Sequence, residues 1–92
     1  MTENTRSAIL KEAEHIVNGN REAEYGNAED NFNTIAMLWS VYIDAKITPK
    51  DVAAMMILLK VARTKSGHGK DDTWIDIAGY AACGAEVMEV QE

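Results

Sequence analysis

Apolar residues recur every three to four positions along most of the chain, and the segments with this period are separated by glycine, asparagine or a single proline. Such a period predicts amphipathic α-helices, and the separating residues are typical of helix ends. The pattern therefore predicts an all-α protein, a compact bundle of four main helices. At 92 residues the chain is short enough that residues 1–92 are expected to form one domain.

Capping signals place the ends of these helices. Asn18 and Gly19 are typical of a C-terminal stop, and Asn27 is a suitable N-cap for the second helix. At residues 48–51 the sequence TPKD places a threonine cap before a proline in the first helical position and an acid in the third. The predicted helices cover about Glu3–Asn18, Ala28–Ala45, Pro49–Ser66 and Asp72–Val87.

The distribution of apolar residues around each helix predicts how the helices pack. One side of the second helix carries Phe32, Ile35, Trp39, Tyr42 and Ile43. The third helix is apolar in nearly every direction, so we expect it to be the central helix, covered on several sides by its neighbours or by a second subunit. In the fourth helix we expect an apolar face made of Trp74, Ile77, Ala78, Ala81, Ala85 and Met88, with Asp72, Asp76, Tyr80 and Cys83 on the other side. Its small residues would let another helix approach closely.

A short chain with this much apolar surface gains from association with a second copy. Met37 and Val41 lie away from the main apolar stripe of the second helix, and a monomer would leave them exposed. The sequence therefore predicts a dimer or a larger homo-oligomer.

Composition excludes several classes of partner. The net charge of −6 and the pI near 4.8 provide no basic field, so neither direct binding to duplex nucleic acid nor binding to an anionic membrane is expected. The longest apolar run, Val52–Leu59, is far shorter than the ~20 residues of a membrane helix, and the N-terminus lacks the apolar core of a signal peptide. Cys83 is the single cysteine, which excludes an internal disulfide and any zinc motif. We expect an intracellular protein.

Four charged residues mark the strongest candidate site. Lys60 and Arg63 lie one turn apart on the almost wholly apolar third helix, and Asp72 and Asp76 lie one turn apart on the fourth. Charges that leave water need a counter-charge or a ligand, so we expect the two pairs to face each other and Arg63 to be coupled to Asp76. The bases either neutralise the acids and orient the helices, or bind phosphate. The acids either cap and pair, or hold Mg²⁺.

Aromatic residues extend this site. Most aromatic side chains are expected in the core. Tyr25 instead lies in a connection close to Arg21, where an aromatic ring and a guanidinium could hold a base or a ribose. Tyr80 lies one turn after Asp76 and is expected at the same site.

Four longer motifs run through the chain: R-E-x-x-Y-G at residues 21–26, D-N-F-x-x-I-A-x-L-W at 30–39, I-T-P-x-D-V-A-x-M-M-x-L-L-K-x-A-R at 47–63 and D-D-x-x-I-D-I-A-G-Y-A-A at 71–82. Together they resemble an uncharacterised family of small phage and prophage proteins that is described as a domain of unknown function. The chain is more distantly similar to the all-α nucleoside triphosphate pyrophosphohydrolases of the MazG type, which hold Mg²⁺ on paired helical carboxylates. Those enzymes carry E-E-x-x-E and E-x-x-D, whereas here Asp72 and Asp76 have a different spacing, and the first motif is replaced by scattered acids, Glu22, Glu24, Glu29 and Asp30.

The resemblance implies a phage or prophage accessory protein in the bacterial host cytoplasm, and we expect it to bind a small nucleotide-like ligand. As a hydrolase, it would hold Mg²⁺ on Asp72, Asp76 and an acid from residues 22–30, with Lys60 and Arg63 stabilising phosphate charge. As a non-catalytic anti-defence protein, it would sequester a nucleotide immune signal without a metal. The ligand-binding residues would be Arg21, Tyr25, Lys60, Arg63, Asp76 and Tyr80. A third alternative is an acidic protein that blocks a host factor.

Overall fold

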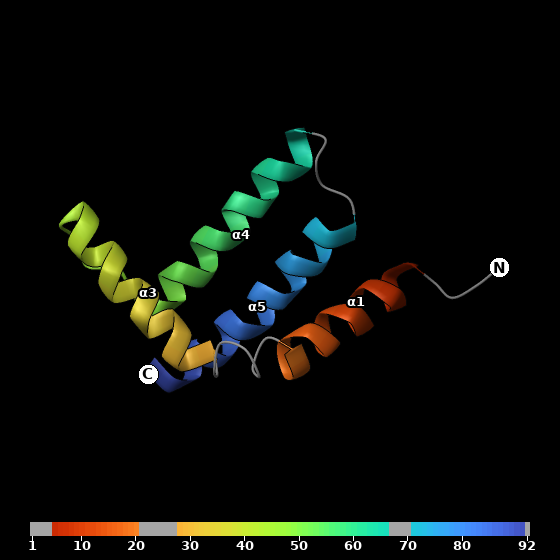
Figure 1. Cartoon of the computed structure of the whole chain (residues 1–92), viewed down its shortest axis with the longest axis horizontal. Helices are drawn as coiled ribbons and strands as arrows, with labels where there is room; N and C mark the ends of the chain where they lie inside the picture. Colours follow the sequence, from red (N-terminus) through yellow and green to blue (C-terminus); the bar gives the residue numbers. More distant parts are fainter. Residues whose placement is uncertain (1–4, 21–27, 67–70, 92) are drawn as a thin grey trace.

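The computed structural model describes residues 5–20, 28–66 and 71–91, with the side chains of 20, 28–30 and 88–91 left aside. Within these ranges the fold is all-α, as predicted. Helix α1 spans Thr5–His15 and continues into a π-helical turn, η1, at Ile16–Asn20. It is followed by α3 at Ala28–Ile43, α4 at Pro49–Ser66 and α5 at Asp71–Gln91 (Figure 1). The predicted start of α3 and both predicted ends of α4 are confirmed, whereas α5 extends beyond the predicted Val87.

Helix α5, not α4, is the central helix of the bundle. It packs against α4 most extensively and also contacts α1, η1 and α3. Figure 1 shows α4 and α5 side by side and antiparallel, with α1 along the opposite flank of α5. Helix α3 lies across the end of the bundle where α4 begins and α5 ends. The third helix is therefore not the central one within a single copy, whereas the alternative that a second subunit covers it stays a prediction. The outer side of α4, which includes Leu58, is exposed.

The core lies at one end of the molecule, where α3, the first half of α4 and the second half of α5 meet. It consists of Phe32, Ala36, Val52, Ala53, Cys83 and Val87. Partly buried side chains from the surrounding segments pack against it, among them Val17, Trp39 and Tyr80. Phe32, Val52 and Val87 are the largest fully buried side chains of the described residues, so the core is small for a domain of this length.

The buried face of α5 differs from the predicted one. Trp74, expected in the core, has a relative exposure of 52%, and Ala81 and Ala85 are also exposed. The buried stripe instead follows Ile75, Gly79, Cys83 and Val87 at intervals of four residues. Small residues on this stripe permit close helix contact, and this contact outweighs the burial of one large indole on the other side.

Helix α3 follows the prediction as far as Trp39. Phe32 is buried, and Ile35 and Trp39 pack against the core as expected. Tyr42, predicted on the same buried side, is 89% exposed, and Ile43 is also exposed. The reason is tertiary, because the end of α3 extends away from α5 (Figure 1).

Two glycines of α5 allow the close packing of its neighbours. A Cβ atom added at Gly84 would lie 3.0 Å from the Cβ of Ala53 in α4, and one added at Gly79 would lie 3.2 Å from Cγ1 of Val17 in η1. Both distances are shorter than ordinary van der Waals contact. The predicted role of small residues in this helix is thus confirmed at these two positions.

Hydrogen bonds determine the turn that joins α3 to α4. Asp44 takes a left-handed conformation with φ of 57°, and the Ala45 N–H donates to the Ser40 carbonyl at 3.2 Å, which is the pattern of a Schellman helix end. The Ser40 hydroxyl donates to the Ala36 carbonyl at 2.7 Å and accepts from the Ile47 N–H at 2.8 Å. Ser40 therefore ties the end of α3 to the segment that starts α4.

The first turn of α4 is a reciprocal capping box, as the sequence TPKD predicts. The Thr48 N–H donates to Oδ2 of Asp51 at 3.0 Å, and the Asp51 N–H donates to the Thr48 hydroxyl at 3.1 Å. The backbone hydrogen bond from Thr48, followed by the side-chain hydrogen bond with the same residue, lowers the pKa of the Asp51 carboxyl below its usual value of 3.8. The carboxylate is therefore the form that the cap prefers.

The first prediction tests the close contact of α4 and α5. Gly84→Val should lower the free energy of unfolding by about 1–3 kcal/mol, because the added carbons overlap Ala53. Ala81→Val, at an exposed position of the same helix, should change it by less than about 0.5 kcal/mol. Urea denaturation at one fixed protein concentration measures both variants. Equal losses in the two variants, or no recovery when Ala53→Gly is added to Gly84→Val, would contradict the contact.

The second prediction concerns the capping box and pH. Because the folded-state pKa of Asp51 is lowered, its contribution is complete above the unfolded-state pKa and is lost as pH falls through the folded-state pKa. Asp51→Asn should therefore cost about 0.3–1.5 kcal/mol at pH 7 and progressively less below about pH 4. Urea denaturation at a series of pH values measures the difference from the parent. Asp44→Asn, which removes the same charge at an exposed left-handed position, is the control and should cost little at any pH.

Candidate functional site

An ion pair joins α4 to α5 near the middle of the molecule. Nζ of Lys60 lies 2.9 Å from Oδ2 of Asp76, and the two side chains are 19% and 38% exposed. The expectation that charges on these helices face each other is confirmed for this pair. The pairing compensates part of the cost of drawing the Lys60 ammonium group out of water.

Arg63 does not form the expected ion pair with Asp76, and its side chain is exposed. The antiparallel register explains the difference. In an antiparallel pair, moving forward along α4 means moving backward along α5. Because Ala53 faces Gly84 and Lys60 faces Asp76, Arg63 is level with Thr73. Thr73 is buried and carries no charge.

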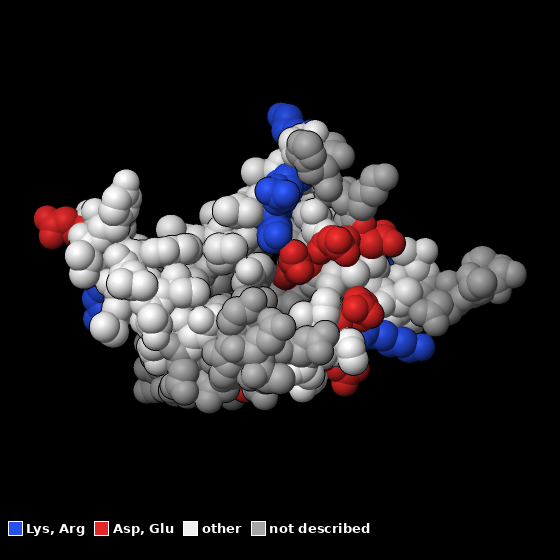
Figure 2. All heavy atoms as spheres, viewed as in Figure 1, with Lys and Arg blue, Asp and Glu red and all other residues white. Residues whose placement is uncertain are grey.

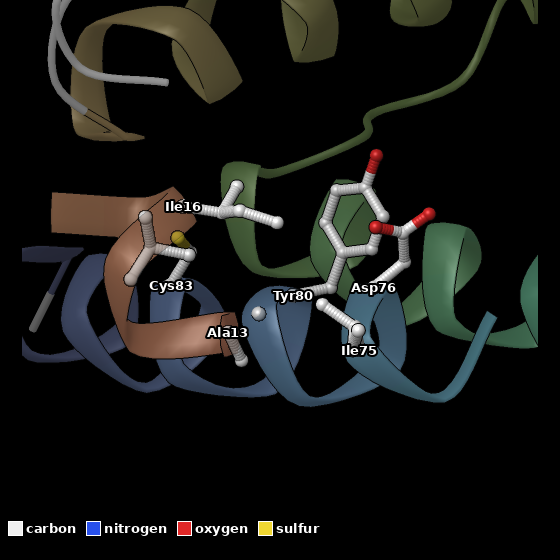
Figure 3. A pocket seen from close by; sticks show the side chains of 8 residues that line it. Ala13, Ile16, Ile75, Asp76, Tyr80 and Cys83 are labelled. Carbon is white, nitrogen blue, oxygen red and sulfur yellow. The ribbon is translucent and has the colours of Figure 1, made fainter. Parts of the chain in front are cut away.

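A small pocket lies beside this ion pair, between α5 and the junction of α1 with η1 (Figure 3). Its lining is mostly apolar, and Asp76 and Tyr80 lie at one end with Ile16 and Cys83 at the other. The space within it is about 20 Å³, which is enough for roughly one water molecule. A nucleotide therefore does not fit inside this pocket, and a ligand of that size would have to bind on the surface beside it.

Tyr80 belongs both to the core and to the rim of this pocket. Its ring centroid lies 6.3 Å from that of Phe32 with the planes tilted by 31°, so the ring packs on α3. Figure 3 shows its hydroxyl pointing in the same direction as the Asp76 carboxylate. The structure thus brings three of the predicted site residues together: Lys60, Asp76 and Tyr80.

The other predicted site residues are described only in part. Asp72 is exposed in the first turn of α5. Arg21 and Tyr25 lie outside the described residues, as do the side chains of the acids at 22–30. Among the side chains that the structure describes, no three His, Cys, Asp or Glu residues are placed to hold a metal ion. The magnesium site on Asp72 and Asp76 stays a prediction.

A second candidate site is the surface of α3 and α4 that faces away from the core. Residues 31–43 and 52–59 contain no Asp, Glu, Lys or Arg. This surface, termed the α3–α4 outer face, exposes eight large side chains: Met37, Leu38, Val41, Tyr42, Met55, Leu58, Leu59 and Val61. Figure 2 shows mostly uncharged atoms over α3 and the adjacent part of α4, with charged atoms at the far left beside the end of α3, basic atoms over the end of α4, and acidic atoms over the start of α5 and α1.

The expected exposure of Met37 and Val41 in a single copy is confirmed, with Val41 81% exposed. Sequence reasoning missed the contribution of Leu38 and Tyr42 to the same surface. A signal for it is present in the sequence, because thirteen consecutive residues without a charge, at 31–43, are unusual for a helix with one face in water.

The described residues include no helix that is long and apolar enough to cross a membrane.

Similarity to known proteins identifies the family. Residues 8–88 match the family model described as Domain of unknown function (DUF6378). The chain belongs to this family. It is 48% identical over 86 residues to the Gene 55 protein of Mycobacterium phage L5, covering 92% of the chain and 54% of that relative. It is 42% identical over 82 residues to the Gene 55 protein of Mycobacterium phage D29, covering 89% of the chain and 54% of that relative.

These findings confirm the resemblance to a phage protein family, whereas the likeness to MazG-type enzymes stays a prediction. The chain spans about half the length of the curated relatives it matches. No solved structure matches the chain.

The third prediction tests the ion pair. Lys60→Met and Asp76→Asn should each cost more stability than the two changes together, because each single change leaves the partner charge partly buried and unpaired. Urea denaturation should give a coupling energy of about 0.5–3 kcal/mol in the double-mutant cycle. The control cycle uses Lys65→Met, at an exposed lysine of the same helix, with Asp76→Asn, and should be additive. Additive losses in the Lys60 cycle would show that the pair is not coupled.

Proposed function

We propose that this member of the phage family is a non-catalytic binding protein, and that it acts by docking the α3–α4 outer face onto an apolar helical surface of a protein. The observation that carries the proposal is the exposure of a charge-free face on two neighbouring helices. Monomeric soluble proteins rarely expose contiguous apolar patches of more than a few hundred Å², and larger ones mark binding sites. Like the third alternative, an acidic protein that blocks a host factor, the proposed binding protein acts through protein contact, but the surface proposed here is uncharged.

The chemistry of the partner follows from the chemistry of the face. It offers methionine, leucine, valine and tyrosine side chains on helical stripes, and residues 31–43 and 52–59 contribute no charge to it. A partner with a matching apolar helix stripe would bury these side chains without desolvating a charged group. Charged partners gain nothing from this face, because electrostatic complementarity needs charges on both sides.

The fourth prediction tests this face by photo-crosslinking in cells that produce the protein. A photoreactive phenylalanine analogue in place of Tyr42, which is 89% exposed, should form a covalent adduct with protein. The same analogue in place of Glu12, an exposed residue of α1, is the matched control and should form little or none. Absence of a protein adduct at position 42, or equal yields at both positions, would contradict the proposal.

A second candidate function is binding of a nucleotide-like ligand, and the environment of Lys60 favours it. Lys60 is a half-buried cation held by Asp76 beside Tyr80, and Arg63 follows one turn later with its side chain exposed. These groups could bind phosphate at the surface next to the pocket. A hydrolase would in addition need Mg²⁺ on Asp72, Asp76 and an acid from residues 22–30. An anti-defence protein that sequesters a nucleotide would need no metal.

The fifth prediction separates these versions by thermal denaturation with nucleotides and cyclic dinucleotides, with and without Mg²⁺. A ligand that binds only the folded state raises the melting temperature. Lys60→Met should abolish that rise if Lys60 holds phosphate, whereas Lys65→Met should preserve it. Product formed only with Mg²⁺ supports the hydrolase, and stabilisation without product supports sequestration. No shift with any nucleotide would contradict both versions.

A further inference from the structure

We infer that the occupant of the α3–α4 outer face is a second copy of this chain, so that the protein is a two-fold symmetric homodimer. This inference rests on the proposed function, because it names the partner of the same face. Three independent observations support it: the amount of exposed surface, the absence of charge from the face, and the position of the core.

The exposed surface is larger than expected for a folded monomer. A compact protein of 10.1 kDa has an accessible surface of roughly 5,300 Å², whereas this chain exposes 6548 Å². The difference is roughly 1,200 Å², and a stable interface of standard size buries about 800 Å² on each partner. The surplus of the whole chain is therefore of the size that one partner of a dimer buries, and the eight exposed side chains of the outer face contribute to it.

The charge distribution is compatible with self-association. In a two-fold interface the same patch appears on both sides, so a charged residue near the axis would meet an identical charge. Two copies that each carry a net charge of −6 repel one another unless their acidic groups stay apart. Residues 31–43 and 52–59 carry no charge. Figure 2 shows most of the acidic atoms over α1 and the start of α5, with a further acidic group at the far left beside the end of α3. Copies that meet at the outer face thus avoid most of this repulsion.

The position of the core identifies what a second copy would provide. One side of α3, with Phe32, Ala36 and Trp39, packs on the core, while Val41 and Tyr42 on its outer side remain exposed. Thirteen residues of uncharged helix extend for about 20 Å, which is long enough to pack along the equivalent helix of another copy. Such packing would bury the outer side of α3 as the core buries its inner side. Interfaces of obligate homodimers are correspondingly apolar.

Sedimentation equilibrium of the full chain at micromolar concentration tests the inference. The parent should sediment as a dimer of the 10.1 kDa chain. Val41→Glu should raise the dimer dissociation constant at least about a hundred-fold, because each interface would then bury two unpaired carboxylates. Asn18→Glu adds the same group at an exposed site on η1 and should leave the constant unchanged. A monomeric parent, or a Val41→Glu variant that remains as dimeric as Asn18→Glu, overturns the inference.

Cysteine crosslinking decides the case in which Val41→Glu loses its helical circular dichroism. Under mild oxidation Val41→Cys should form a disulfide-linked dimer, whereas Asn18→Cys should stay unlinked, with buried Cys83 present in both. Equal linkage in both variants overturns the inference. If the parent is a monomer and the variant with the photoreactive analogue at position 42 crosslinks to a different protein, the dimer is refuted and the proposed function is left intact. If that variant forms no adduct with any protein, the dimer and the proposed function are both refuted.

Discussion

The close antiparallel contact of α4 with α5 is the constraint on which the rest of the structure depends. Gly84 has no side chain, so the backbone of α5 approaches Ala53 to a distance that any other residue would obstruct. This contact determines the register of the two helices, and the register in turn places Asp76 level with Lys60. It also turns the stripe of Ile75, Gly79 and Cys83 inward, where Gly79 admits Val17 from the other flank. The ion pair and the small pocket are both consequences of it.

The same arrangement leaves the bundle unevenly covered. Because the small residues bring α5 close to α4 and η1, there is little volume between these helices for large side chains, and the core gathers where α3 adds Phe32. The outer sides of α3 and α4 then have no neighbour within the described chain. A domain with few large buried side chains gains much of its stability from association, which links the small core to the exposed outer face. The small core and the exposed outer face therefore both follow from the close contact of α5 with its neighbours.

The two candidate sites differ in how the structure supports them. The corner formed by Lys60, Asp76 and Tyr80 has the polar groups that an anionic ligand needs, but its pocket has room for roughly one water molecule. The outer face exposes eight large side chains, and the uncharged segments 31–43 and 52–59 resemble the apolar, charge-depleted core of a protein interface. The family description names no activity that would favour one site over the other. The physical chemistry of the two sites favours the α3–α4 outer face.

The sequence by itself determined the features that depend on neighbouring residues. The helices, the capping box of Thr48 and Asp51, and the charge-free segments follow from local periodicity and local hydrogen bonds, which act over three or four positions. The tertiary structure decided which face of α5 is buried and which cation pairs with Asp76. Hydropathy favoured burial of Trp74 over burial of Gly79, and it did not show whether Lys60 or Arg63 pairs with Asp76. Neither the buried face nor the ion pair depends on composition. Both depend on the register of two helices, which is determined by the distance between their backbones at Gly84.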